Sequence, residues 1–442
     1  MQIKPGMEKI SNSKMLTGMF GAYSKFTINV KLLIALTFAG GIGGGMTWFM
    51  LTLYMQSVGF SFENIGWIGG IGGIATTLTY LITPAVANSF GKKNTLYAGY
   101  FLGILSAVIL LIKVDLVLYI ISSIVGGIGS ALVGPTYITV LSNMADRKIG
   151  IYVFSFQSFS QQIGMSIGTI MGGVLPAGLT HLSGNVIIAF WWSIVLAVLI
   201  NTLQIVFLFF TNVENGIKLH GFSLKMKDRI KITKFGITNM FIGLGAGFVI
   251  PWFPLFFTNK FFLSQYPDFN TAYANALPLV SLIMTISSII MSFSFLVAPF
   301  FAERFGQVKL IVGSQLLSVL FLFLIPFAPA FLFAGTLYII RTILMMFSSP
   351  IATAFMMSAV DPEDKTNANS ITMFAWNAAW SVSYFSSGWI WAMSPDYLLP
   401  FALCSVFYIT SSVLYFVFFI NIERKEKIAE KTKRKCKVNL IW

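Results

Sequence analysis

The feature that most constrains this chain is a series of long apolar runs. A helix needs about 20 apolar residues to cross the hydrocarbon core of a membrane, and twelve runs of about that length follow one another along the sequence. In the strands of a membrane barrel polar and apolar residues alternate, and no such alternation occurs within these runs. We therefore predict an all-α membrane protein with twelve transmembrane helices, at 32–55, 64–88, 95–113, 116–141, 150–176, 185–210, 235–258, 276–301, 308–327, 330–357, 368–393 and 399–421.

The composition and the charges agree with this prediction. Only 10% of the residues are charged, whereas a soluble chain carries about 25%. The net charge of +14 does not indicate a nucleic-acid partner, because 26 of the 29 Lys and Arg residues fall on one side of the twelve predicted spans. Positive charge collects on the cytoplasmic side of membrane proteins. We expect both termini in the cytoplasm and the chain in the plasma membrane.

The sequence also repeats itself. PAVANSFGKK at 84–93 is answered by PFFAERFGQV at 299–308, and GIGGG at 41–45 by GLGAG at 243–247. We predict two pseudo-symmetric six-helix bundles, an architecture that suits transport by alternating access. The predicted parts are a cytoplasmic leader at 1–31, bundles at 32–210 and 235–421, a cytoplasmic linker at 211–234 and a basic cytoplasmic tail at 422–442.

The two repeated turns resemble the loop after the second span in the major facilitator superfamily, G-x-L-A-D-R-x-G-R-K-x-x-L. The first turn matches it at Ala87, Gly91, Lys93 and Leu96, and departs from it at Pro84, Asn88 and Ser89; the second fits at Ala302, Arg304, Gly306 and Ile311. The resemblance in layout covers about residues 30–421 and implies a transporter with the substrate held between its halves. A monomer is the family expectation.

The resemblance also implies a gate at the two turns. A glycine lets two helices meet closely, and the neighbouring charges can pair with helix ends in only one transporter state. The alternative is that both turns are simply tight and positively charged. The gating candidates are Gly91, Lys92, Lys93, Glu303, Arg304 and Gly306.

Arg341 is predicted at mid-membrane in the tenth span. A charge at that depth costs at least about 2.5 kcal/mol unless it meets water or partners, and no acid lies in a span to pair with it. We predict either that it meets an anionic or carbonyl-bearing substrate, or that it ties its helix to neighbouring helices.

The fifth span carries glycines spaced along one face, and these resemble the superfamily's antiporter pattern with Thr169 in place of the proline. This favours an exporter. The alternative is a packing seam of small residues, which is common in membranes. The glycines are Gly164, Gly168, Gly172 and Gly173.

Aromatic and amide side chains recur at helical spacing in spans that line the substrate cavity in the resembled fold. As a set we predict that they bind substrate, although single Trp and Tyr residues also serve as interfacial anchors. With Arg341 these candidates are Trp48, Tyr80, Gln157, Gln161, Trp252, Trp376, Asn377 and Trp380.

The sequence argues against an enzyme, a metal site and any cofactor. The two histidines, His181 and His220, are predicted in loops, and neither a zinc motif nor a Walker loop is present. We predict a secondary transporter of a small amphipathic or aromatic compound, an exporter in exchange for protons. The alternatives are an uptake symporter or facilitator for a sugar, peptide or organic acid, and a membrane receptor or scaffold without transport.

Overall fold

The computed structural model describes residues 26–144, 150–213, 226–361 and 364–439. Throughout this described part the regular structure is helical, as predicted. Most of the predicted leader and half of the predicted linker lie outside the described residues, so the domain limits there stay predictions.

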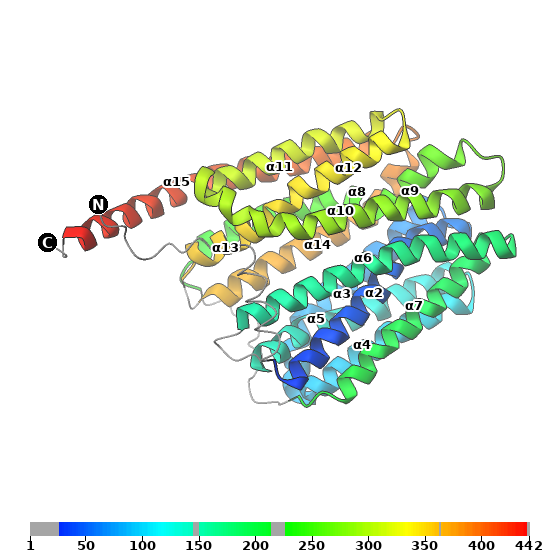
Figure 1. Ribbon diagram of the computed structural model, residues 1–442, viewed down its shortest axis with the longest axis horizontal. Coiled ribbons are helices and arrows are strands. Elements are labelled where there is room, and N and C mark those ends of the chain that lie inside the picture. Colours follow the sequence, from blue (N-terminus) through cyan, green and yellow to red (C-terminus); the bar gives the residue numbers. More distant parts are fainter. Residues whose placement is uncertain (1–25, 145–149, 214–225, 362–363, 440–442) are drawn as a thin grey trace, which may run out of the picture.

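The first bundle consists of six helices that run back and forth across the molecule (Figure 1). Within it α2 packs on α6 and α7, while α5 packs on α3 and α4. The helices are α2 (Ile28–Ser57), α3 (Phe62–Phe90), α4 (Lys92–Ile112), α5 (Leu116–Met144), α6 (Gly150–Ser183) and α7 (Val186–Phe209).

The second bundle repeats this arrangement with α8 packed on α14 and α15, and with α11 packed on α12 and α15. Its long helices are α8 (Arg229–Val249), α10 (Phe269–Phe305), α11 (Gln307–Leu324), α12 (Phe331–Phe347), α14 (Lys365–Ala392) and α15 (Leu398–Asn439). Short elements continue three of them: η1 (Ile250–Trp252), α9 (Phe253–Thr258) and η2 (Asn259–Leu263) after α8, η3 (Ile325–Phe327) after α11, and α13 (Ser349–Ala359) after α12.

Eleven helical segments of the described chain are long and apolar enough to cross a membrane. The twelfth bundle helix, α14, is 28 residues long and richer in Ser, Thr and Asn. It packs between α8 and α3, and its buried polar residues are Thr372, Ser381, Ser383 and Ser387. The predicted all-α fold of twelve membrane helices in two bundles is confirmed, and the chain is a multi-pass integral membrane protein.

Three predicted spans are not single helices, and the ninth span ends in the 3-10 turn η3, which contains Pro326. The seventh breaks at Pro251 and Pro254, where a 3-10 turn and a short α-helix replace the regular helix before a π-helical segment ends it. Proline lacks the N–H that an interior helix position donates, and its ring clashes with the carbonyl four residues before it. The tenth span divides in the same way ahead of Pro350, at the start of α13.

The two repeated turns have nearly identical backbones. Gly91 joins α3 to α4 with φ 85° and ψ 145°, and Gly306 joins α10 to α11 with φ 91° and ψ 148°. Only glycine adopts such a conformation without strain. The glycine of each turn is therefore required by the backbone, as the repeat suggested.

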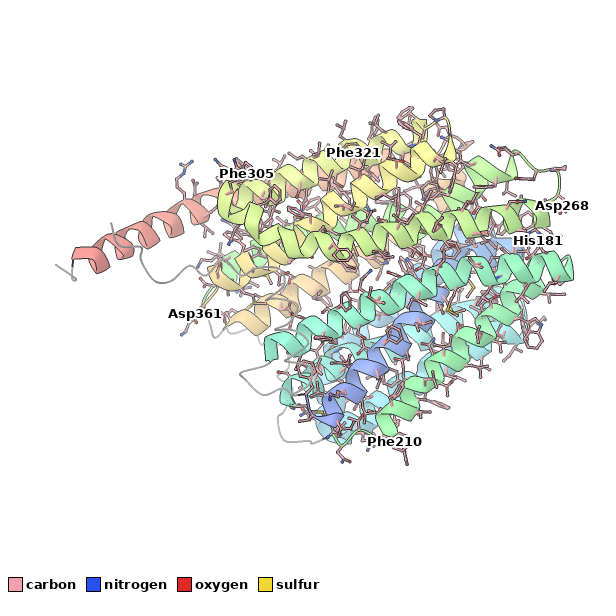
Figure 2. The ribbon with its side chains drawn as sticks, in the orientation of Figure 1. His181, Phe210, Asp268, Phe305, Phe321 and Asp361 are labelled. Carbon is pink, nitrogen blue, oxygen red and sulfur yellow. The ribbon has the colours of Figure 1, made fainter. Side chains whose placement is uncertain are left out.

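Each helix bundle has two ends, which we call the near end, where α2 begins and α15 leaves the bundle, and the far end opposite. Figure 2 shows Asp361 at the near end, and His181 and Asp268 at the far end. His181 lies in the last turn of α6 and not in a loop as predicted; a basic side chain is favourable there because helix C-termini carry partial negative charge. His220 lies outside the described residues.

The last helix, α15, does not stop where its apolar run stops. It continues as one helix through most of the predicted tail to Asn439. Figure 1 shows its final part extending beyond all the other helices at the near end.

Candidate functional site

The two bundles meet along two seams, α3 against α14 and α6 against α10. At the far end of the first seam the backbones touch. A Cβ added at Gly66 would lie 2.9 Å from the backbone nitrogen of Gly388, and one added at Gly388 would clash with the carbonyl of Phe62. Glycine thus permits the same close approach that small residues give in helix pairs of membrane proteins.

The second seam is also closed at the far end. A Cβ at Gly173 of α6 would clash with the Ser281 hydroxyl of α10, and the Tyr273 hydroxyl of α10 bonds Gln56 of α2 at 2.7 Å. Figure 1 shows the ribbons of the two bundles converging towards this end and diverging towards the near end. The described state is therefore closed between the bundles at the far end.

Three of the predicted binding residues come together at mid-helix between the bundles. Trp48 of α2 lies 6.3 Å from Trp380 of α14, measured between ring centroids, and Trp376 stacks on Trp380 at 5.1 Å. Trp48 is 45% exposed. Asn377, on the same helix, donates its amide to the Met373 carbonyl. These tryptophans form an aromatic cluster, Trp48–Trp376–Trp380, that bridges the two bundles.

Trp252 lies apart from that cluster, in the closure at the far end. It is fully buried, stacks on Trp391 at 5.5 Å, and donates its indole N–H to the Ser387 hydroxyl at 2.8 Å. Phe62 of α3 packs on it across the seam. The contacts of Trp252 are therefore those of a packing residue in the described state.

Arg341 is buried inside the second bundle. Its guanidinium bonds the Tyr408 hydroxyl of α15 at 3.1 Å and lies over the rings of Phe253 and Tyr408, at 5.8 and 5.7 Å. Its backbone carbonyl accepts a hydrogen bond from Ser318 of α11. These contacts match the structural alternative, because they tie α12 to α9, α11 and α15. A contact with substrate stays a prediction.

The remaining predicted binding residues face the first bundle. Gln157 and Gln161 of α6 are hydrogen-bonded to each other at 3.0 Å. Tyr80 of α3 lies beside Gly134 of α5. The structure thus divides the predicted set among the aromatic cluster, the far end, and the interiors of the two bundles.

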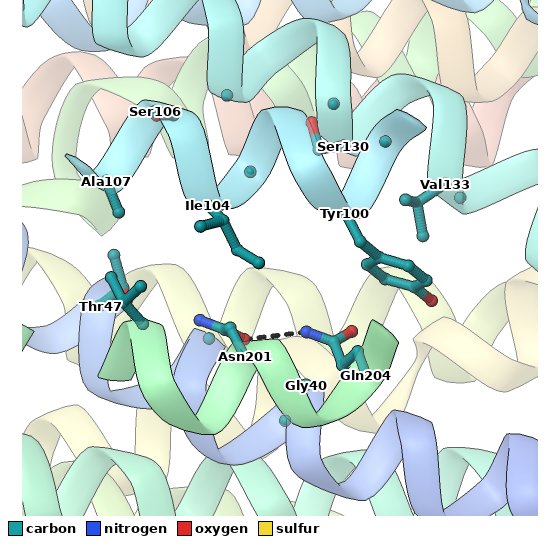
Figure 3. Close-up of a pocket in the computed structure, with 18 of the residues that line it drawn as sticks. Gly40, Thr47, Tyr100, Ile104, Ser106, Ala107, Ser130, Val133, Asn201 and Gln204 are labelled. Carbon is teal, nitrogen blue, oxygen red and sulfur yellow. Dashed lines mark hydrogen bonds between the residues drawn. The ribbon is translucent and has the colours of Figure 1, made fainter. Parts of the chain in front are cut away.

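The interior of the first bundle contains a cavity of about 640 Å³, which we call the first-bundle cavity (Figure 3). Residues of α2, α4, α5, α6 and α7 line it, Gln157 and Gln161 among them. Asn201 and Gln204 of α7 also line it, hydrogen-bonded to each other at 2.9 Å. The sequence analysis missed this second amide pair, although two amides three residues apart in an otherwise apolar run were its available signal.

The glycines of α6 are accounted for by packing. A Cβ at Gly164 or Gly168 would clash with the backbone of α2, and one at Gly172 would lie 3.1 Å from the Met46 carbonyl. They are therefore contact points of α6 with α2, which agrees with the predicted seam of small residues. Their link to export stays a prediction.

The gating candidates contact their own bundles in the described state. Lys93 donates to the carbonyls of Phe209 and Thr211, at the end of α7. In the second turn, the Glu423 carboxylate of α15 accepts from the backbone nitrogens of Gln307 and Val308. A carboxylate at a helix N-terminus is favoured by the free N–H groups there.

The gating candidates Lys92, Arg304 and Glu303 differ in their exposure. Lys92 is buried, while Arg304 is exposed and lies over the ring of Phe305. Glu303 belongs to α10, but its side chain lies outside the described residues.

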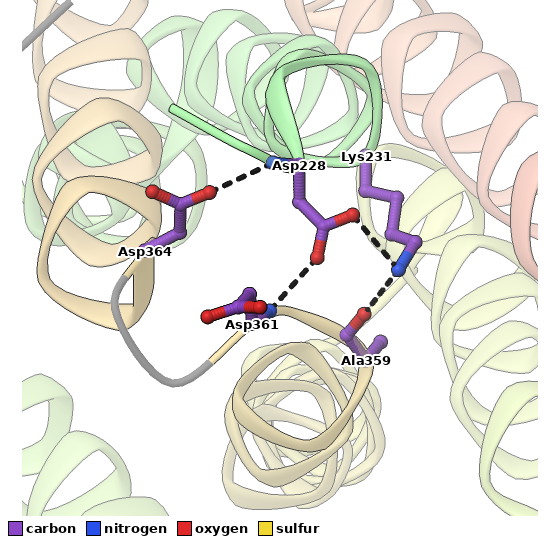
Figure 4. Close-up of polar contacts among 5 residues, drawn as sticks. All are labelled: Asp228, Lys231, Ala359, Asp361 and Asp364. Atoms are coloured by element: carbon purple, nitrogen blue, oxygen red, sulfur yellow. Dashed lines mark hydrogen bonds and ion pairs between the residues drawn. The ribbon is translucent and has the colours of Figure 1, made fainter. Parts of the chain in front are cut away.

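A cluster of polar side chains lies at the near end of the second bundle (Figure 4). Asp228, before α8, accepts from the backbone nitrogen of Asp361 at 2.8 Å and pairs with Lys231 at 3.0 Å. Its own backbone nitrogen donates to Asp364, the N-cap residue of α14. The N–H of Asp361, and then Lys231, lower the pKa of the Asp228 carboxyl. This group attaches the start of α8 to the connection between α13 and α14.

Comparison with known proteins agrees with this architecture. Residues 235–440 match the family model of the Major Facilitator Superfamily. An uncharacterised MFS-type transporter of Methanocaldococcus jannaschii is 27% identical over 152 residues, which span 34% of this chain and 39% of that relative.

Solved structures with the same fold cover nearly the whole chain. The nucleoside transporter NupG has a TM-score of 0.70 at 16% identity, covering 89% of this chain and 99% of its own. A D-xylose–proton symporter has a TM-score of 0.66 at 14% identity, covering 91% and 98%. A bacterial homologue of the human lysosomal transporter Spinster, in an inward-facing and occupied conformation, has a TM-score of 0.66 at 12% identity, covering 88% and 96%.

The chain thus has the fold of these solved membrane transporters. The resemblance to the major facilitator superfamily, predicted from the two repeated turns, is confirmed.

Proposed function

We propose that the protein is a secondary transporter that moves a small amphipathic or aromatic compound by alternating access, and that it exports this compound in exchange for protons. The observation that carries the proposal is the aromatic cluster Trp48–Trp376–Trp380, which lies at mid-helix between the bundles. Tryptophan binds planar, apolar molecules through its large ring face. The export direction rests on the glycine pattern of α6 alone.

Alternating access requires that the far-end seams separate in a second state. The glycine contacts between α3 and α14 support this part of the proposal, because the two backbones meet at Gly66 and Gly388 with no side chain of either glycine between them. We further propose that the near end faces the cytoplasm, that the protein acts in the plasma membrane as a monomer, and that it does not bind nucleic acid.

A second candidate is uptake or facilitated diffusion of a neutral solute. Glu63 and Glu423 each lie one residue inside the end of a described span, and no acid lies deeper in the described spans. A proton-carrying acid at mid-membrane is therefore missing from these spans. Solved transporters of a nucleoside and of D-xylose with the same fold favour this candidate as well.

The test is flux in proteoliposomes of neutral aromatic dyes, a nucleoside and a sugar, with and without a pH gradient. Gradient-driven dye efflux supports the exporter, and flux of the nucleoside or the sugar, with or without the gradient, supports the second candidate. Trp380→Ala should lower dye flux by roughly tenfold. Trp192→Ala is the matched control, because Trp192 is 56% exposed on α7. Binding without any flux would leave only a receptor or scaffold.

A further inference from the structure

The first-bundle cavity lies where glycines of neighbouring helices leave space that side chains would otherwise fill. It separates α2 and α7 on one side from α4 and α5 on the other (Figure 3). Gly44 of α2 and Gly103 of α4 line it, and a Cβ added at either would meet no atom within 4 Å. Its volume of about 640 Å³ lies within the range of about 300–1,000 Å³ typical of small-molecule sites.

The polar wall of the cavity is held in place by glycines. Gln204 lies against Gly40 and Asn201 lies against Gly43, so closely that a Cβ at either glycine would clash with the amide. The two amides bond each other through Gln204 Nε2 and Asn201 Oδ1. Asn201 Nδ2 and Gln204 Oε1 are left as a donor and an acceptor beside each other.

Both amides lie inside α7, since Asn201 is eight residues and Gln204 five residues before its last residue, Phe209. Polar groups at membrane depth are costly unless they find hydrogen-bond partners. A partner that offers both a donor and an acceptor, such as a hydroxyl group, matches the unused pair. The apolar residues around it, Ile104, Val133 and Val198 among them, suit a hydrocarbon body.

The lining contains no charged side chain. A charged ligand would therefore lose its hydration without gaining a counter-charge. We propose that the first-bundle cavity binds a neutral amphipathic molecule, with its hydroxyl or amide head on Asn201 and Gln204 and its apolar body between α4 and α2. This site lies inside one bundle, apart from the aromatic cluster between the bundles, and its occupation does not depend on the transport proposal.

The experiment uses the full chain in phosphatidylcholine nanodiscs and a dodecan-1-ol probe with a photoreactive diazirine in its chain. Mass spectrometry locates the labelled peptides. We expect saturable labelling of the α4 and α7 lining, displaced by unlabelled dodecan-1-ol. Dodecanoate and dodecylamine, which differ only in their charged heads, should displace the probe at least roughly tenfold less well.

Two cavity-filling variants on opposite walls, Gly44→Phe and Gly103→Phe, should each reduce labelling about tenfold or more. Gly313→Phe on α11 is the matched control, since a Cβ there also meets open space. Asn201→Leu should weaken binding of the alcohol roughly three- to tenfold, the effect of one or two hydrogen bonds.

Two outcomes would overturn the proposal: labelling of this lining that does not saturate, or equal displacement by the charged and the neutral competitors. Since these readouts use the unmodified chain, they hold even if a variant fails to fold. Displacement by dioleoylglycerol identifies the bilayer as the source of the ligand. Displacement by indole identifies a soluble neutral compound.

Discussion

The closed far-end seam predicts that a single methyl group will shift the protein towards its other state. Gly388 of α14 lies directly against the backbone of α3 at Phe62 and Glu63. In Gly388→Ala the new Cβ meets backbone atoms, which cannot rotate away as a side chain would. Overpacking of this kind costs about 1–3 kcal/mol. Because the contact exists only while the seam is closed, the whole cost falls on the closed state.

That cost corresponds to about a 5- to 150-fold rise in the population of the state that is open at the far end, relative to the closed state. The reporter is a cysteine at Ser281, which is fully buried in the other seam, in a Cys436→Ser background. The rate at which a membrane-impermeant maleimide labels this cysteine measures separation of the bundles. Cys404 does not interfere, because it is buried. Gly388→Ala should raise this rate within the stated range.

The control is Gly313→Ala, where a Cβ meets no atom within 4 Å. An unchanged rate in Gly388→Ala, or an equal rise in Gly313→Ala, would refute the reasoning. Thermal unfolding of both variants in detergent separates seam opening from general loss of structure.

Three further predictions concern the turns, the near end and the buried arginine. Gly91→Ala and Gly306→Ala should each destabilise the fold by about 1–3 kcal/mol, because of their positive φ; thermal unfolding measures this, with Gly178→Ala as control. The folded-state pKa of Asp228 is lowered, so its stabilising effect is present above the unfolded-state pKa and is lost as pH falls through the folded value. Asp228→Asn should therefore flatten the acid side of the stability profile, and an unflattened profile would contradict this. Tyr408→Phe should cost about 1.5–3 kcal/mol by removing the hydrogen bond to Arg341, and a double-mutant cycle of unfolding with Arg341→Met should show coupling.

Much of the fold could be predicted from the sequence, because each membrane-spanning helix requires a long run of apolar residues. The limits of the helices could not be read from apolarity alone. For example, α10 begins at Phe269, seven residues before the predicted span, because Asp268 caps it by accepting from the Thr271 backbone nitrogen. The two turns were predicted best, since their glycines meet a local backbone requirement.

The candidate site was predicted less well, because it depends on how each helix is rotated in its bundle. The sequence places Trp48 and Trp380 at similar depths, and the structure brings them together. It also places Arg341 at mid-membrane but does not say that the side chain faces Tyr408 and not the seam. Asn201 and Gln204 could not be recognised as part of a cavity wall from their own helix, because their positions depend on contacts with Gly43 and Gly40 of α2.

The long last helix has a practical consequence for imaging. From Leu398 to Asn439, α15 has 42 residues, which gives a length of about 63 Å at 1.5 Å per residue. The hydrocarbon core of a membrane is only about 30 Å thick, so a large part of this helix extends outside it as a rod. A small globular protein fused to α15 in continuous helical register would stand at a fixed angle to the bundles. It would provide the asymmetric landmark that electron cryomicroscopy needs to align a particle otherwise hidden in its micelle.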